Sequence, residues 1–205
     1  PDEIIRLMAQ LERFINEPDN EIDPLIRMAV IHHRFESIHP FYDGNGRTGR
    51  IINVLYLVHA GLLDIPVLYL SRYLVRHKNE YYRLLQAVRE TGEWQPWVLY
   101  MLEAVAETAQ QSITVVSAIR AAMQDYKHRI RDKFSFYSQD LINHLFCHPY
   151  TKIEFVADAL SVSRQTAAKY LDELVTENLL HKEKLGKSNY YINIVLYDIL
   201  SKQAA

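Results

Sequence analysis

The chain has 205 residues, of which 49% are hydrophobic and 23% charged, and its formal net charge is −2. This composition is typical of folded domains and excludes a disordered tail, a collagen-like repeat and a disulfide-rich miniprotein. The net charge also provides no overall basic field that would recruit nucleic acid or an anionic membrane. The single cysteine, Cys147, cannot form an intrachain disulfide. This is typical of a reducing compartment, so we expect a cytoplasmic protein.

Helical periodicity dominates residues 1–133, and no pair of strands stands out there. The longest apolar stretch, residues 51–63, is interrupted by Asn53 and His59 and is too short to span a bilayer, so we expect no membrane partner. The chain starts at Pro1 and enters a helical pattern at once, which indicates an N-terminally incomplete domain. We expect five helices in this region. The first follows an Asp2 cap, and the second runs from Asp23-Pro24 to His39-Pro40. The third covers residues 48–60 and ends at Gly61, the fourth runs from a Ser71 cap to Gly92, and the fifth covers residues 96–131.

Residues 135–205 have a different pattern, with three short helices expected over 137–146, 153–160 and 164–177, the last capped by Ser163. Residues 179–185 and 189–194 then alternate around Gly186-Lys187, which indicates a hairpin. Three helices followed by a hairpin resemble a winged helix-turn-helix module. The segment S-V-S-R-Q-T-A-A-K-Y-L-D-E-L at 161–174 is similar to its turn and recognition helix. We therefore predict a mainly α protein, with a helical domain at 1–133 and a small α+β domain at 135–205.

Glycine is scarce, yet three of the six glycines, at positions 44, 46 and 49, lie within six residues. The spacing matches the dinucleotide fingerprint G-x-G-x-x-G, but that fingerprint has meaning only after a strand and within a βαβ unit. Here the preceding segment is helical, so we reject a Rossmann site. A P-loop is also excluded, because G-x-x-x-x-G-K-[ST] does not occur in the sequence.

Residues 39–50 read H-P-F-Y-D-G-N-G-R-T-G-R and favour a loop followed by the start of a helix. Glycines around Asn45 allow successive N–H groups to form an anion-binding nest, and a helix N-terminus adds its own donors. Arg47 and Arg50 lie three residues apart, as suits two guanidinium groups on one polyphosphate. Asp43 offers one hard oxygen to Mg²⁺, and His39 a general base. An ordinary helix end and turn would explain each feature alone, but their order within twelve residues favours a site.

The same segment is similar to the signature of the Fic family, H-P-F-x-[DE]-G-N-G-R-x-x-R, and it fills every specified position. The resemblance extends to L-Y-L-S-R-Y at 68–73 and Y-Y-R-L-L at 81–85. It also covers the winged-helix tail, which some bacterial members carry. The resemblance implies a protein adenylyltransferase that transfers AMP from ATP to a Ser, Thr or Tyr hydroxyl of a target protein and releases pyrophosphate.

By this resemblance, His39 takes the proton from the attacking hydroxyl and Asp43 holds Mg²⁺ between the α- and β-phosphates. The backbone of 44–46 cradles the phosphates, and Arg47 and Arg50 contact the β- and γ-phosphates. Tyr81 and Tyr82 match a place where members approach adenine or ribose, although packing within the helix explains this pair equally well. The residues implied in nucleotide binding are Asp43, Gly44, Asn45, Gly46, Arg47, Thr48, Gly49, Arg50, Tyr81 and Tyr82.

Two positions and one missing pattern bear on the expected adenylyl transfer and its regulation. Arg89 stands where some relatives have an asparagine for the base, and Gly46 stands where related kinases have a lysine, which favours nucleotidyl transfer. Many members are restrained by a glutamate in the pattern [ST]-x-x-x-E-[GN] that pairs with the second arginine. This pattern is absent from the printed sequence, so we expect no such glutamate to neutralise Arg50 and an unrestrained chain.

Two alternatives stay open. One is a DNA-binding regulator in which the first domain senses a nucleotide and Arg164, Gln165, Thr166 and Lys169 face a groove of DNA. The second domain, however, holds seven Lys and Arg against eight Asp and Glu, so it lacks the basic footprint of a DNA-binding domain. The other is a Fic enzyme that transfers a different phosphate-containing group. The sequence also leaves open a homodimer.

Overall fold

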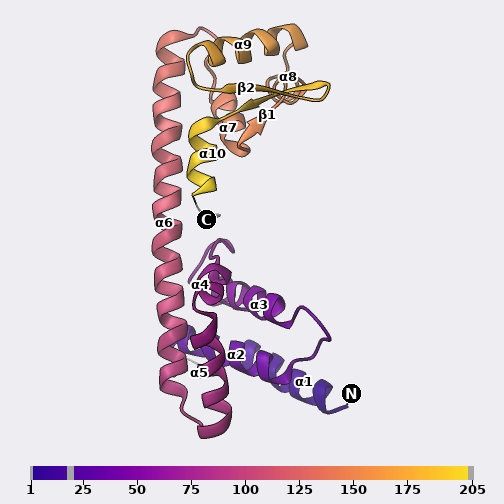
Figure 1. Cartoon of the computed structure of the whole chain (residues 1–205), viewed down its shortest axis with the longest axis vertical. Helices are drawn as coiled ribbons and strands as arrows, with labels where there is room; N and C mark the ends of the chain where they lie inside the picture. Colours follow the sequence, from indigo (N-terminus) through magenta and orange to yellow (C-terminus); the bar gives the residue numbers. More distant parts are fainter. Residues whose placement is uncertain (1, 18–20, 203–205) are drawn as a thin grey trace. The chain divides into compact units, whose positions relative to one another are not determined.

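Figure 1 shows the computed structural model, which describes residues 2–17 and 21–202. It is mainly α-helical with one small sheet, as the sequence predicts. The elements are α1 (Asp2–Asn16), α2 (Pro24–Ile38), α3 (Asn45–His59), α4 (Leu70–Arg76), α5 (Lys78–Thr91), α6 (Trp94–Lys133), α7 (Gln139–Cys147), β1 (Tyr150–Thr151), α8 (Ile153–Leu160), α9 (Arg164–Thr176), β2 (His181–Leu185), β3 (Ser188–Ile192) and α10 (Ile194–Ser201).

The chain divides into two compact units, Pro1–Ser112 and Ile113–Ala205. This division falls inside α6, about twenty residues before the boundary expected near residues 131–135. The difference arises because α6 contributes to both cores. Trp97 and Met101 belong to the core of the first unit, whereas Tyr126 and Ile130 belong to the core of the second.

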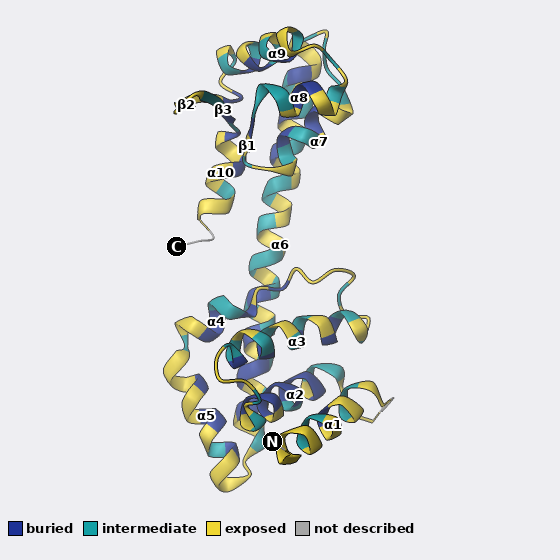
Figure 2. Cartoon of the chain, turned by 90° about the vertical axis from the view of Figure 1, so that its right-hand side faces the viewer, coloured by how far each residue is buried: buried dark blue, intermediate teal, exposed yellow. Residues whose placement is uncertain are grey.

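In the first unit, the ends of α2 follow from the sequence. The Asp23 side chain accepts a hydrogen bond from the Leu25 N–H at 2.8 Å, and Pro24 fills the first helical position. At the other end, His39 adopts a left-handed conformation and its N–H donates to the Phe35 carbonyl. Both predicted ends are therefore confirmed. Figure 2 shows that much of α2 is buried, which makes it the central helix of this unit.

Two helix boundaries differ from the expectation. Helix α3 begins at Asn45 rather than at residue 48, because Gly44, with φ +84°, already turns the chain into the helix. The helix expected from Ser71 to Gly92 is instead divided into α4 and α5 at His77, and Ser71 lies inside α4. At this break the His77 carbonyl accepts from the Tyr81 N–H at 3.0 Å and from the Tyr100 hydroxyl at 3.4 Å. The His77 carbonyl thus keeps the hydrogen bond of a regular helix, from Tyr81, and accepts a second bond from α6.

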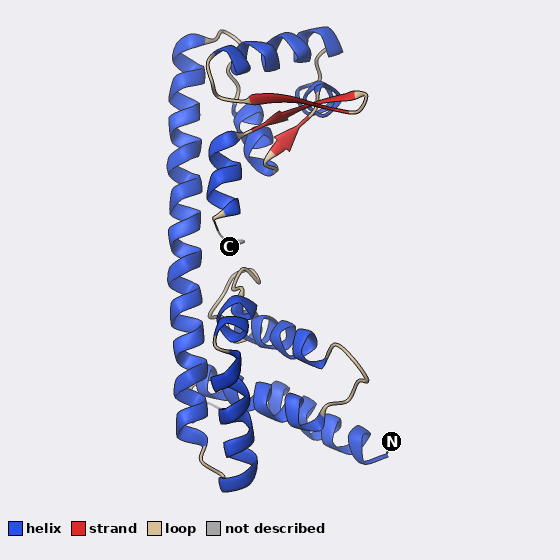
Figure 3. Cartoon of the chain, viewed as in Figure 1, coloured by secondary structure: helices blue, strands red, loops and turns tan. Residues whose placement is uncertain are grey.

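Besides the C-terminal part of α6, the second unit contains helices α7, α8, α9 and α10 and an antiparallel sheet of order β1-β3-β2, drawn in red in Figure 3. The predicted hairpin is confirmed: Leu185 pairs with Ser188, and Gly186 turns with φ +63°. The Ser163 cap is confirmed too, because its side chain accepts from the Thr166 N–H at 3.1 Å. The two-residue strand β1 and helix α10 were not predicted.

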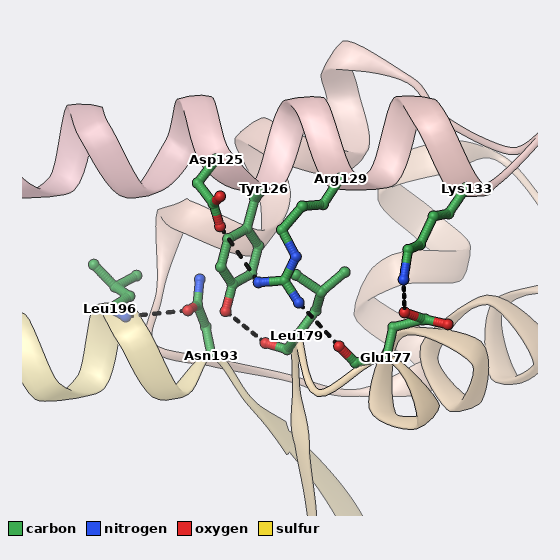
Figure 4. A network of polar contacts seen from close by, with 8 residues as sticks. All are labelled: Asp125, Tyr126, Arg129, Lys133, Glu177, Leu179, Asn193 and Leu196. Carbon is green, nitrogen blue, oxygen red and sulfur yellow. Dashed lines mark hydrogen bonds and ion pairs between the residues drawn. The ribbon is translucent and has the colours of Figure 1, made fainter.

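Polar contacts tie the C-terminal part of α6 to the segment between α9 and β2 (Figure 4). The Tyr126 hydroxyl donates to the Leu179 carbonyl at 2.6 Å, and Arg129 donates to the Glu177 carbonyl at 3.0 Å. Lys133 forms an ion pair with the Glu177 carboxylate. These bonds satisfy backbone carbonyls just after α9, where the chain leaves the helix. They explain why α6 continues to Lys133 as part of this unit.

Within the described ranges, no helix combines the length and the apolar character needed to cross a bilayer.

A buried polar cluster holds α2, α3 and α5 together in the first unit. The His32 side chain is fully buried, with Asn53 Nδ2 3.0 Å from its Nδ1 and the Tyr81 hydroxyl 3.0 Å from its Nε2. A neutral imidazole offers one donor and one acceptor, which is what these two neighbours require. Burial lowers the pKa of His32 to about 4, and the nearby Arg50 charge acts in the same direction.

The buried His32 predicts that the first unit loses stability as the pH falls. Between about pH 6.5 and pH 4 the unfolded chain binds a proton on His32 that the folded chain does not, so the free energy of unfolding decreases with falling pH. The full loss is roughly 3 kcal/mol. Urea denaturation from pH 7.5 to 4.5 would measure this slope. A His32→Asn variant should flatten it, whereas His59→Asn, at an exposed position, should not; equal slopes in all three proteins would contradict the prediction.

Candidate active site

The predicted base, His39, lies at the point where α2 ends and a short loop begins. Its left-handed backbone, with φ 50° and ψ 58°, ends the helix while the side chain stays exposed. The next five residues lead directly to α3, so the ring lies within a few residues of a helix N-terminus. This position provides a solvent-accessible imidazole six residues before the start of a helix, whose N-terminus is a place where anions bind.

Asn45 shapes the loop from inside rather than facing solvent. It is buried, its Oδ1 accepts from the Phe41 N–H at 3.0 Å, and its Nδ2 donates to the Phe41 carbonyl at 2.6 Å. These two bonds close residues 41–45 into a compact turn. The sequence assigned Asn45 to nucleotide binding, whereas in the structure its side chain serves the loop conformation. The Phe41 ring, 6.3 Å from the Phe35 ring and half-exposed, covers this turn only partly.

The first turn of α3 carries the remaining polar groups of the motif. Asp43 is 92% exposed and pairs with Arg47, with Oδ2 3.2 Å from Nη2. The Thr48 hydroxyl donates to the Gly44 carbonyl at 3.0 Å, so it is used within the helix. Arg47 and Arg50 both line a cavity of about 450 Å³ whose other walls include Leu55, Leu68 and Tyr69. The structure therefore brings the two arginines to one hollow, as their spacing predicts.

Gly49 is the point of closest approach between α2 and α3. A Cβ placed on Gly49 would lie 2.8 Å from Glu36 Oε1 and 3.2 Å from both His32 Cε1 and Phe35 Cδ1. A larger residue requires these side chains of α2 to shift, because contacts this short are repulsive. Gly49 therefore serves helix packing in the structure, and its part in nucleotide binding stays a prediction. Gly44 and Gly46 remain on the loop side of the motif.

The tyrosine pair is divided between the core and the surface. Tyr81 is buried and its hydroxyl is used by His32, and burial together with the Glu36 charge raises its pKa. Tyr82 is exposed, and its ring meets the Tyr81 ring edge-on at 5.1 Å. Tyr81 therefore has the packing role that the sequence left open. Only Tyr82 is placed to contact a ligand from solvent.

Two residues of this region were not singled out as site residues by the sequence. Glu36, on α2, is buried although it carries an ionisable side chain. This burial is the only sign that the residue has a special role. Arg89, on α5, donates from Nε to the Ser37 hydroxyl at 3.2 Å and from Nη2 to the Glu36 carbonyl at 3.1 Å. Arg89 thus fixes the last turn of α2, immediately before His39. This contact spans 52 residues of sequence, so no local pattern reveals it.

A metal ion at this site would have to be held jointly by the loop of residues 39–44 and by the phosphates of a bound nucleotide. Among the residues that the structure describes, no group of three or more His, Cys, Asp or Glu side chains is arranged for a metal. Asp43 supplies one exposed carboxylate two residues before the start of α3. One carboxylate combined with phosphate oxygens and waters is the donor set that Mg²⁺ usually takes, so the residues fit a magnesium–nucleotide complex rather than an all-protein site.

In the second unit, the candidate DNA-contacting residues lie on the exposed side of α9. Arg164 Nη2 is 3.8 Å from Glu154 Oε2, and Lys169 Nζ is 3.8 Å from Glu173 Oε1. The Thr166 hydroxyl is 2.9 Å from that of Ser163, at the helix cap. Gln165, Thr166 and Lys169 also line a hollow with Phe136 and Tyr170. Both cations thus lie beside carboxylates, which weakens the local basic character that DNA binding requires.

Comparison with protein families now adds to this geometry. Residues 1–57, which contain α1, α2 and the whole His39–Arg50 segment, match the Fic/DOC family. This part of the chain is similar to the Fic/DOC family. Residues 122–196 match the family described as "Protein adenylyltransferase SoFic-like, C-terminal domain". The two matches fall on the two units of the structure.

Individual relatives agree with this assignment. Over 109 residues the chain is 31% identical to the "Protein adenylyltransferase Fic" of Drosophila yakuba, covering 53% of this chain and 21% of that protein. The protein of the same name from Drosophila melanogaster is 30% identical over the same shares. The chain thus spans about a fifth of the length of these curated relatives.

A solved Fic family protein from Desulfovibrio desulfuricans G20 shares the fold, with a TM-score of 0.50. The two are 22% identical, and the match covers 93% of this chain and 55% of the other.

The packing of α2 against α3 predicts that Gly49→Ala is destabilising. The added methyl group would meet Glu36, His32 and Phe35 within 3.2 Å, so the free energy of unfolding should fall by about 1–3 kcal/mol. Gly46→Ala is the matched control, because the one short contact of its methyl group would be with the flexible end of Arg50 at 3.1 Å, Glu36 Oε1 lies at 3.8 Å, an ordinary van der Waals distance, and alanine favours a helix. Denaturant unfolding of the two variants would measure the difference. The packing role of Gly49 is wrong if both variants are equally stable.

Proposed function

We propose that the protein is an adenylyltransferase that moves AMP from ATP to a Ser, Thr or Tyr hydroxyl of a protein and releases pyrophosphate. The observation that carries the proposal is the arrangement at the α2–α3 junction. An exposed His39 is followed by a compact turn that ends at a helix N-terminus, with Arg47 and Arg50 lining one hollow beside it. The names of the curated relatives support the same reaction.

In this reaction the hydroxyl oxygen of the target attacks the α-phosphorus of ATP, and the bond from that phosphorus to the oxygen bridging to the β-phosphate breaks. Pyrophosphate leaves with the electron pair, and the hydroxyl proton passes to a ring nitrogen of His39. Arg47 and Arg50 bind the phosphates of the leaving group and offset the charge that develops there. The N–H groups of the first turn of α3 orient the chain of phosphates.

Asp43 and the nucleotide phosphates would together hold Mg²⁺, which supplies positive charge to the phosphate oxygens when bound. In the structure Asp43 pairs with Arg47 at 3.2 Å. Binding of magnesium and nucleotide therefore requires this exposed pair to open. An exposed pair of this kind contributes little stability, so its opening costs little.

The alternatives differ in the phosphate that is transferred. An enzyme that phosphorylates its target transfers the γ-phosphoryl group, and a nucleotide-sensing regulator transfers none. If the protein is a nucleotide-sensing regulator, its second unit would bind DNA through α9, although Arg164 and Lys169 each lie beside a carboxylate. DNA binding remains a prediction from the sequence, to be tested by a salt-dependent gel shift.

The proposal predicts that label from the α-phosphate of ATP, and not from the γ-phosphate, appears on hydroxyl side chains of the chain itself or of added proteins when Mg²⁺ is present. His39→Ala should lower the transfer rate by about 10²–10⁴, because a positioned base contributes this much. His59→Ala, an exposed histidine at the far end of α3, is the matched control and should leave the rate unchanged. Transfer of γ-label would instead indicate a kinase, and absence of both labels would contradict the proposal.

A further inference from the structure

The backbone carbonyl of Glu36, in the last turn of α2, cannot be satisfied by the chain that follows it. In a regular helix it would accept from the N–H of residue 40, but this residue is Pro40 and has no N–H. The N–H groups of His39 and Phe41, on either side of the proline, donate to a carbonyl one residue earlier and to the Asn45 side chain. This carbonyl therefore needs a donor from elsewhere in the fold.

Arg89 of α5 supplies that donor. Its Nη2 donates to the Glu36 carbonyl at 3.1 Å, and its Nε donates to the Ser37 hydroxyl at 3.2 Å. A guanidinium group presents its donors in a rigid fork, so the two bonds together fix the direction in which it meets α2. The structure describes α2 along its whole length, and the last turn of this helix has no basic residue of its own. Arg89 thus also brings the positive charge that a helix C-terminus favours.

The part of α5 that carries Arg89 is itself fixed to the core. Val88, the preceding residue, is buried, and so is Leu85, one turn earlier. The Leu85 carbonyl lies 3.2 Å from Nε2 of His33, a buried residue of α2. Arg89 therefore extends toward the end of α2 from a backbone that is already held against the same helix. Its two bonds can impose a defined position on the last turn.

The last turn of α2 determines where the imidazole of His39 lies. His39 directly follows the helix, and its left-handed backbone, with φ 50°, turns the chain into the loop. We propose that Arg89 is a positioning residue for His39: it binds the carbonyl that Pro40 leaves without a donor and so holds the last turn, and with it the imidazole, in place. This inference rests on the proposed function and concerns how its base is held. The role does not require Arg89 to touch the nucleotide.

A loosened turn should affect the transfer step more than the binding of nucleotide. Arg89→Ala retains His39 but lets its ring sample more orientations, of which fewer place a ring nitrogen beside the attacking hydroxyl. Since a misplacement of about 1 Å can cost about 10²-fold in rate, kcat should fall about 10- to 10²-fold, while the KM for magnesium–ATP changes less than about threefold. Arg89→Lys, which retains the charge and a donor, should recover part of kcat.

The test compares steady-state transfer of label from the α-phosphate by the full chain and by Arg89→Ala, Arg89→Lys, His39→Ala and the double variant Arg89→Ala/His39→Ala. Because Arg89 acts through the imidazole, its removal should cause no further loss once His39 is gone. Arg83→Ala is the matched control, since Arg83 is exposed on the same helix and pairs with Glu80 at 2.6 Å; it should behave as the unchanged chain.

Three kinetic results would overturn the proposal. An unchanged kcat in Arg89→Ala would show that the bonds to α2 do not serve the reaction. A raised KM at unchanged kcat would place Arg89 on the nucleotide instead. Additive losses in the double variant would show that Arg89 acts independently of His39.

Hydrogen exchange in nucleotide-free protein separates this inference from the reaction itself. The His39 N–H donates to the Phe35 carbonyl at 3.0 Å, so its exchange rate reports opening of the last turn of α2. Arg89→Ala removes a charge-assisted bond, and exchange at His39 should become about tenfold faster or more, while the amide of Ile31, in the buried middle of α2, keeps its rate.

The exchange measurement has its own outcomes. A chain that transfers no label but shows this local acceleration refutes the adenylyltransferase proposal and retains the role of Arg89 at the end of α2. Equal acceleration at His39 and Ile31 would indicate a loss of stability along the whole helix. That result, or an unchanged rate at His39, overturns the positioning role whether or not label is transferred.

Discussion

The close contact of α2 and α3 at Gly49 is the constraint on which the candidate site depends. Because Gly49 has no side chain, α3 lies against Glu36, His32 and Phe35 of α2. The C-terminus of α2 and the N-terminus of α3 are then joined by a loop of only six residues. The distance from the imidazole of His39 to the arginines is therefore set mainly by helix packing, which positions groups more accurately than a long loop could.

Features that depend on a few neighbouring residues could be predicted from the sequence. The Asp23-Pro24 start of α2, the Ser163 cap of α9 and the turn at Gly186 all follow from local hydrogen bonds or from backbone conformation. The twelve-residue motif belongs to this class as well. Its glycines and charges lie close together in the chain, so their order alone predicted the loop and the two arginines on one side of the following helix, although the helix starts three residues earlier than expected.

Features that depend on distant partners could not be predicted in this way. The break at His77 involves a tyrosine of α6, and the strand β1 is defined only by its pairing with β3. Glu36 is an ordinary polar residue of an amphipathic helix until the packing of α3 buries it. Tyr81 shows the converse, because a residue that resembles a ligand contact is used by the core. Such roles emerge only when the helices are placed against one another.

The left-handed backbone of His39 has a consequence for how this position can evolve. Residues other than glycine and asparagine rarely adopt this conformation, since the Cβ atom approaches the following carbonyl at a cost of roughly 1–2 kcal/mol. A helix end chosen for stability alone would carry glycine here. The histidine thus occupies a position whose backbone conformation favours glycine. A lineage that lost the need for the imidazole would be expected to drift toward glycine or asparagine at this position and to gain stability as it did so.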